Sequence, residues 1–130
     1  MNKYDRGALI ALERNDRRTW AMLRIAADEG GLVQVPTGAI AQAWRDGARQ
    51  APLARALQHC DEAALDGLAA RAAGLLCGRT GTSDVVDASV VVAAAALGRA
   101  ERVTILTSDP DDINHLVEML DLEVNVQVAG

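Results

Sequence analysis

The sequence predicts an α/β fold of three layers, in which helices cover both faces of a central, mainly parallel sheet. Short apolar runs bounded by turn residues alternate with helix-like stretches along the chain. The 130 residues fit one domain, over residues 1–130, and half of them are hydrophobic, which is enough for a core. The apolar residues are mostly Ala, Leu and Val, with no Phe, and such small and branched side chains suit helix–sheet packing.

The N-terminal half alternates two short strands with helical stretches. The first strand is predicted at residues 1–5, although Asn2 and Lys3 are unusual in a buried central strand. The second, over residues 32–35, is apolar and ends where Pro36 removes a backbone donor. Helices are predicted over residues 7–14, from a cap at Asn15 or Asp16 to Asp28 before Gly30-Gly31, and from a Thr37 cap to about Gly47.

The C-terminal half is predicted to hold longer helices and further strands. An Ala/Leu-rich stretch from Glu62 to Cys77 and an apolar stretch from Asp84 to Arg99 predict helices. Residues 102–107 predict a strand, and residues 124–128 alternate like an edge strand. Shorter elements are predicted as a helical piece over residues 51–58, a brief strand at 58–60, a loop at 78–82 and a helix over 111–120.

Three aspartates stand at junctions of the predicted elements. Asp5 follows the first strand, Asp109 follows the strand over residues 102–107, and Asp87 opens an apolar helix pattern. Such junctions lie at the carboxyl edge of a parallel sheet, where α/β proteins bind ligands. Carboxylates that meet there repel each other unless a cation lies between them. The sequence therefore predicts a Mg²⁺ or Mn²⁺ site, because both ions prefer oxygen ligands.

Helix capping is the competing explanation for each acid. Residues 109–112, Asp-Pro-Asp-Asp, form a strong helix start with a capping Asp and a Pro at the first helical position. Asp84 and Asp87 fall in a first turn, where the helix dipole favours negative charge, and they share one helix face. Capping explains one carboxylate per helix start. It does not explain why acids from three distant segments fall on one predicted edge.

Composition and charge limit the partners and the compartment. At a formal net charge of −5 the chain is a poor non-specific nucleic-acid binder, so RNA contact needs a local basic patch or a metal. Arginines that cluster between residues 14 and 49 could form such a patch, but a solvated helix face is the simpler interpretation.

Cys60 and Cys77 lack metal-ligand spacing and are expected to be buried thiols. With no visible signal peptide or membrane-length apolar run, we expect a soluble, cytoplasmic protein without membrane contact.

Other chemistries have weaker support. His59 and His115 are isolated, and no serine stands in a nucleophile elbow. A nucleotide-binding α/β protein is a further alternative. The segment Gly78-Arg79-Thr80-Gly81 argues against it, because no Walker lysine follows and no GxGxxG opens the first helix.

Four segments together resemble PIN-domain proteins. Residues 5–12, Asp-Arg-Gly-Ala-Leu-Ile-Ala-Leu, resemble the opening segment of that family, and Val35-Pro36 resembles its second strand and turn. Residues 86–93 resemble its Asp-Ala helix start, and residues 105–112 resemble its Thr-[Ser/Asn]-Asp signature. The ordered set spans essentially the whole chain. A single domain this short most resembles the VapC-type toxins of bacterial toxin–antitoxin pairs.

The resemblance implies a three-layer PIN-like domain with Mg²⁺- or Mn²⁺-dependent ribonuclease activity on cellular RNA of the tRNA or rRNA class. It also implies a cognate antitoxin partner and a homodimer. Carried over by position, Asp5, Asp87 and Asp109 match the catalytic, metal-binding acids of the family. Asp112 and Asp84 are expected to support them.

One position departs from the family pattern. Gln42 stands where the family usually carries a Glu, in the helix after the second strand, so one negative ligand is lost. Glu13 and Asp46 are candidates to replace that charge. The departure supports an alternative function, in which the chain is a catalytically weakened PIN-like module that works by binding a partner protein.

Overall fold

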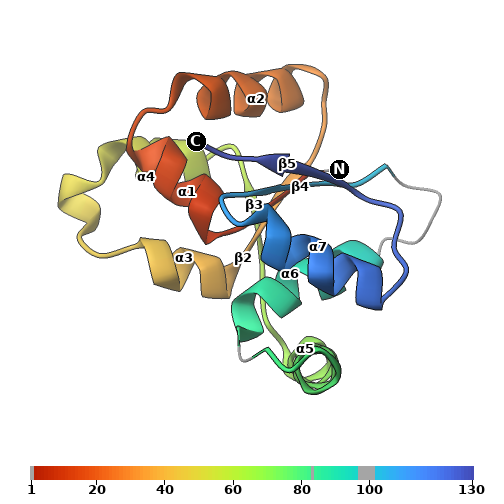
Figure 1. The fold of residues 1–130 in the computed structure, drawn as a ribbon. Helices are drawn as coiled ribbons and strands as arrows, with labels where there is room; N and C mark the ends of the chain where they lie inside the picture. The colour runs from red at the N-terminus through yellow and green to blue at the C-terminus, as the bar shows by residue number, and fades with distance from the viewer. Residues whose placement is uncertain (1, 83, 97–101) are drawn as a thin grey trace.

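A five-stranded parallel sheet forms the centre of the protein, with the strand order β3-β2-β1-β4-β5 (Figure 1). The computed structural model describes residues 2–82, 84–96 and 102–130. The strands are β1 (Asn2–Tyr4), β2 (Val33–Pro36), β3 (Asp61–Ala63), β4 (Thr104–Thr107) and β5 (Asn125–Val128). From β1 the chain moves outward through β2 to β3, and it then returns to the other side of β1 for β4 and β5. The strand order therefore reverses between β1 and β4, a position at which α/β sheets commonly open a ligand site.

Helices cover both faces of the sheet. One core joins α1, α2, α3 and α4 to β1 and β2, and a second core joins α5, α6 and α7 to β4. Figure 1 shows these two groups of helices on either side of the strands. Their bounds are α1 (Arg6–Glu13), α2 (Arg17–Asp28), α3 (Thr37–Ala43), α4 (Ala51–Leu57), α5 (Gly67–Thr80), α6 (Val85–Ala95) and α7 (Pro110–Met119), with a short 3₁₀ turn, Gly47–Arg49, before α4. The predicted α/β class and the helices on both sheet faces are confirmed.

The segment before α5 differs from the prediction. The helix expected from Glu62 begins only at Gly67, because Glu62 lies in the strand β3 and pairs there with Val35 of β2. The brief strand expected at residues 58–60 is a turn. The Asp66 carboxylate accepts a hydrogen bond of 2.8 Å from the Ala69 N–H and so starts α5. The helix then runs through most of the loop predicted at 78–82 and ends at Gly81, whose φ is +74°.

Two further helix boundaries were predicted wrongly. The helix expected to reach Gly47 stops at Ala43. There the Gln50 side chain donates to the Ala43 carbonyl and accepts from the Arg45 and Asp46 N–H groups, which redirects the chain. Thr37 is the first residue of α3 rather than its cap. The helix expected to reach Arg99 is described through Ala95, and the prediction for residues 97–99 lies outside the described residues, as does that for Met1.

The central strand β1 carries a buried lysine. Lys3 is 1% exposed, and its ammonium donates to the Gln34 side chain on β2. Burial lowers the pKa of this ammonium. An unusual residue for a central strand is thus accommodated by a polar neighbour across the sheet. Among the described residues, no helix is long and apolar enough to cross a membrane.

Candidate functional site at the carboxyl edge of the sheet

Asp5 lies at the point where β1 ends and α1 begins. Its carboxylate accepts a hydrogen bond of 3.0 Å from the Ala8 N–H, and its own N–H donates to the Leu106 carbonyl at 3.2 Å. The residue is only 3% exposed, and burial raises the pKa of the carboxyl. A hydrogen bond with Thr107 and the charge of Arg6 act in the opposite direction. Asp5 is therefore a helix cap, and it is fixed between β1 and β4.

The start of α6 brings two further carboxylates to Asp5. Asp84 caps the helix by accepting a hydrogen bond of 3.0 Å from the Asp87 N–H. The pKa of Asp87 is raised to about 7, first by burial and then by the negative charges of Asp84 and Asp5. Asp5, Asp84 and Asp87 therefore form one electrostatically linked group.

The start of α7 adds a pair of acids. Asp109 occupies the cap position of α7, yet its side chain makes no capping hydrogen bond. Its N–H donates to the Thr107 hydroxyl at 2.9 Å. A hydrogen bond shared with Asp109 raises the pKa of Asp112, and the charges of Asp109 and Asp84 act in the same direction. The expectation that the Asp109 side chain caps its helix is therefore wrong, because that carboxylate pairs with Asp112 instead.

The five predicted site residues thus lie at the starts of three helices, and the charge of each acid acts on at least one of its neighbours. Asp84 links the two groups, since its charge acts on both Asp87 and Asp112. Within residues 2–82, 84–96 and 102–130, however, no three carboxylate, imidazole or thiolate side chains stand close enough to hold a metal ion together. Carboxylate oxygens suit Mg²⁺, which usually keeps several waters and takes only one or two protein carboxylates. The donor set therefore fits a hydrated ion and does not fit an all-protein cage.

The residues considered as substitutes for a missing Glu do not approach this edge. Glu13 is the last residue of α1, at the opposite end of the helix from Asp5, and it accepts a hydrogen bond of 3.0 Å from the Leu53 N–H. Asp46 pairs with Arg49 at 3.5 Å on the exposed surface. Gln42 lies in α3, and among the described residues its side chain makes no hydrogen bond.

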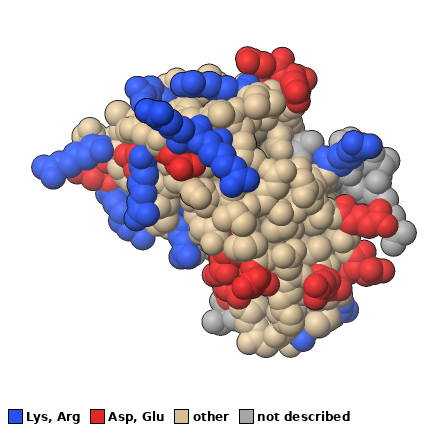
Figure 2. Space-filling view, turned by 45° about the horizontal axis from the view of Figure 1, so that its top comes forward, with Lys and Arg blue, Asp and Glu red and all other residues tan. Residues whose placement is uncertain are grey.

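A basic groove lies away from these acids. Its lining includes Arg17, Trp20 and Arg24 of α2 with Arg55 of α4, around a space of about 790 Å³. Figure 2 shows Lys and Arg side chains gathered at the upper left of this face with some acidic side chains among them, and further acidic groups at the top and toward the lower right. The simpler interpretation of the arginines as one solvated helix face is therefore incomplete. Trp20 and Arg24 stand four residues apart on α2 and so share one face of the helix, a spacing that is visible in the sequence.

The fold and this edge define a three-layer α/β domain with an acidic site where the strand order reverses. A chain of the crystal structure of VapBC2 from Rickettsia felis, bound to a DNA fragment from their promoter, has the same fold, with a TM-score of 0.64. The match covers 98% of this chain and 97% of the other, at 9% sequence identity. No family model and no curated protein sequence matches the chain. The predicted resemblance is thus confirmed at the level of the fold.

Proposed function

We propose that this protein is a metal-dependent endoribonuclease that acts as the toxin of a toxin–antitoxin pair. One observation carries the proposal: more carboxylates meet at the edge beside β1 and β4 than helix capping requires. Asp87, Asp109 and Asp112 cap no helix by a side-chain hydrogen bond, yet they stand beside two acids that do. The shared fold with a chain of the VapBC2 structure supports the toxin–antitoxin part of the proposal.

The acids would have distinct tasks in this function. Asp5, Asp87 and Asp109 would hold a hydrated Mg²⁺ or Mn²⁺ ion, one or two of them directly and the rest through waters bound to the ion, and Asp84 and Asp112 would hold these acids in place through the contacts described above. When bound, such an ion lowers the pKa of a water molecule, orients a phosphodiester and stabilises the leaving oxygen. Because Asp5 is buried and tied to α1, it fixes one side of the site before any ligand binds.

Asp5→Asn tests the proposal without removing the cap, since Asn also caps helices well. The expected result is a loss of Mg²⁺-dependent RNA cleavage of about 100-fold or more, because an essential charge is removed at the ion. Asp66→Asn is the matched control, because it makes the same change at the cap of α5. Cleavage by purified Asp5→Asn at the wild-type rate, with contaminating nuclease excluded, would refute the proposal.

The weakened binding module remains the second candidate, and Gln42 with the open spacing of the acids favours it. Calorimetric titration with Mn²⁺ separates the two. The ribonuclease should bind Mn²⁺ at millimolar concentration or below, and Asp87→Asn should weaken that binding. Gln42→Glu should strengthen it by restoring a negative ligand. Absence of Mn²⁺ binding to the wild-type chain would favour the module.

The partner and the assembly are part of the same proposal. The chain would be inhibited by a small antitoxin and would form a homodimer, with cellular RNA of the tRNA or rRNA class as substrate. Co-expression with the adjacent reading frame should yield a co-purifying chain and suppress cleavage. Light scattering of the isolated protein should give twice the mass of 13.7 kDa. A protein that stays monomeric and recruits no product of that reading frame would contradict the toxin assignment.

A further inference from the structure

We propose that the groove between α2 and α4 binds single-stranded RNA, with arginines on the phosphates and a base stacked beside Trp20. The inference rests on the proposed function, which makes RNA the substrate, and it adds a second contact surface away from the acidic edge. The groove encloses about 790 Å³, a volume within the range of ligand sites.

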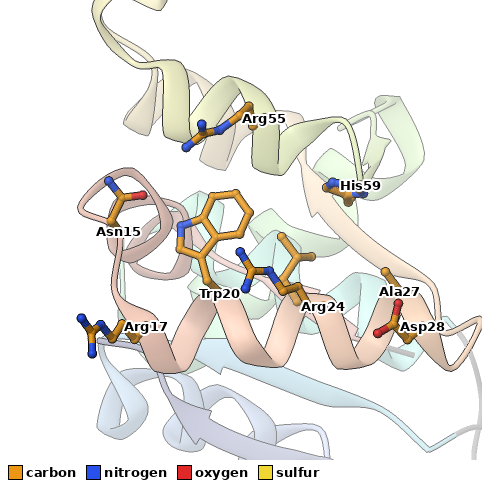
Figure 3. Close-up of a pocket in the computed structure, with 9 residues that line it drawn as sticks. Asn15, Arg17, Trp20, Arg24, Ala27, Asp28, Arg55 and His59 are labelled. Atoms are coloured by element: carbon orange, nitrogen blue, oxygen red, sulfur yellow. The ribbon is translucent and has the colours of Figure 1, made fainter.

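The arginines of the groove are uncompensated. Arg17 and Arg24 of α2 and Arg55 of α4 form no ion pair with any described residue. Asp28 is the one acid among the lining residues in the described chain, and Figure 3 places it toward the end of α2 away from Arg17. In a protein of net charge −5, this local excess of guanidinium groups marks a site for an anionic ligand.

Trp20 gives the groove a rigid aromatic centre. Its indole N–H donates to the Leu12 carbonyl at 2.9 Å, which fixes the orientation of the ring. The guanidinium groups of Arg24 and Arg55 each lie over the ring, 6.0 Å from its centroid. Bases of single-stranded RNA stack on aromatic rings and on arginine planes, while arginine forks bind phosphate oxygens in pairs. The three side chains therefore offer both kinds of contact at one place.

An RNA strand fits this groove better than the apolar face of a helix. Figure 3 shows Trp20, Arg24 and Arg55 in the space between α2 and α4, so the cations occupy the interior of the groove and not only its rim. An apolar partner would bury these charges without pairing them, which is costly. Phosphate groups would pair them.

The groove also lies within reach of the acidic edge. Asp5 caps the first turn of α1, and the Trp20 indole N–H donates a hydrogen bond to the Leu12 carbonyl near the other end of that helix. Eight residues of α-helix separate the two places by about 12 Å. A strand a few nucleotides long could therefore occupy both, and the groove would attract the phosphates that the acidic edge repels.

Fluorescence anisotropy with a short, labelled single-stranded RNA of mixed sequence tests the inference in EDTA, where cleavage cannot occur. Arg24→Gln/Arg55→Gln removes two cations and keeps good helix formers. Arg71→Gln/Arg79→Gln on α5 is the control, because it changes the net charge equally on a helix at the other side of the sheet from α2 (Figure 1). We expect the groove variant to bind about fivefold more weakly or worse, and its salt slope to fall by about 1.4, or about 0.7 per lost phosphate contact.

The tryptophan provides an independent readout. In a Trp44→Phe background, Trp20 is the remaining tryptophan, and RNA binding should quench its emission. Equal losses in both double variants, or no loss in either, would overturn the inference, as would unchanged Trp20 emission at saturating RNA. It would equally be overturned if the groove variant bound RNA normally but lost a co-expressed protein partner. Groove-dependent RNA binding in a chain whose acidic-edge variants cleave normally would instead contradict only the proposed catalytic site.

Discussion

Asp87→Asn should make the metal-free protein more stable at neutral pH, although it removes a proposed ligand. The pKa of Asp87 is raised from 3.8 to about 7 by burial and by the charges of Asp84 and Asp5. Between these two values the unfolded chain has lost the Asp87 proton while the folded chain keeps it. Unfolding then releases a proton, so the free energy of unfolding falls as the pH rises.

The magnitude follows from the size of the pKa change. A rise from 3.8 to about 7 corresponds to about 4 kcal/mol in full, at about 1.4 kcal/mol per pH unit. Because the side chain is partly exposed, solvent screening reduces this to about 1–2 kcal/mol. Asp87→Asn also loses the favourable interaction with the dipole of α6, which reduces the gain in stability by about 0.5 kcal/mol. We therefore expect Asp87→Asn to unfold about 2–5 °C above wild type at pH 8, and the gap to shrink toward pH 5.

Urea and thermal unfolding in EDTA at pH 5, 6, 7 and 8 would measure this effect. Asp66→Asn is again the control, since it makes the same Asp-to-Asn change at the exposed start of another helix, α5. Mn²⁺ at pH 8 should raise the stability of the wild-type protein and not that of Asp87→Asn. Parallel pH profiles for wild type and Asp87→Asn would refute the proposed repulsion among these acids.

Four other single substitutions test how the edge and the strand β1 beside it are built. Gly7→Ala would place a methyl group 1.9 Å from the Ser108 hydroxyl, so urea unfolding should show a loss of about 2 kcal/mol or more, partly recovered by Gly7→Ala/Ser108→Gly. Lys3→Met should raise the stability at pH 7 by about 1 kcal/mol, because burial disfavours the charged ammonium of Lys3. This gain should fade as the pH rises toward 10.5, where the ammonium is lost in the unfolded chain as well. A lower stability of Lys3→Met would show that the hydrogen bond between Lys3 and Gln34 is net favourable. Asp84→Ala should lower the free energy of unfolding by about 1 kcal/mol, because it removes the cap of α6. Asp109→Ala should change the stability by less than about 0.5 kcal/mol, because the Asp109 side chain makes no capping hydrogen bond. Equal losses in the two variants would show that Asp109 also caps its helix.

The layers of the fold and the common edge of the acids follow from chain order. In a parallel sheet every strand ends at one edge, so a residue that follows a strand is placed by topology alone. This reasoning put Asp5 and Asp109 beside β1 and β4 without any knowledge of side chains. It failed for β3, because the exposed Asp61 and Glu62 show no apolar pattern and pair only through backbone bonds with β2.

Contacts between side chains were beyond sequence reasoning. The Asp109 carboxylate could have capped α7 or paired with Asp112, and the sequence fits both choices equally. The groove joins Trp20 of α2 to Arg55 of α4, and no periodicity relates residues that far apart. Which side chains meet is decided by helix packing across α1, and that packing depends on the core as a whole.

The surplus of carboxylates gives the acidic edge its meaning. Helix starts carry positive partial charge, and one capping acid at each supplies the usual side-chain hydrogen bond and opposes the dipole. Asp5 and Asp84 fulfil that role for α1 and α6. Asp87, Asp109 and Asp112 then add negative charge that no helix requires, and the raised pKa values of Asp87 and Asp112 show that this charge is opposed within the fold. Such an arrangement costs stability unless a cation joins it, so a gain in stability from divalent ions is the most direct measure of whether the edge is a metal site.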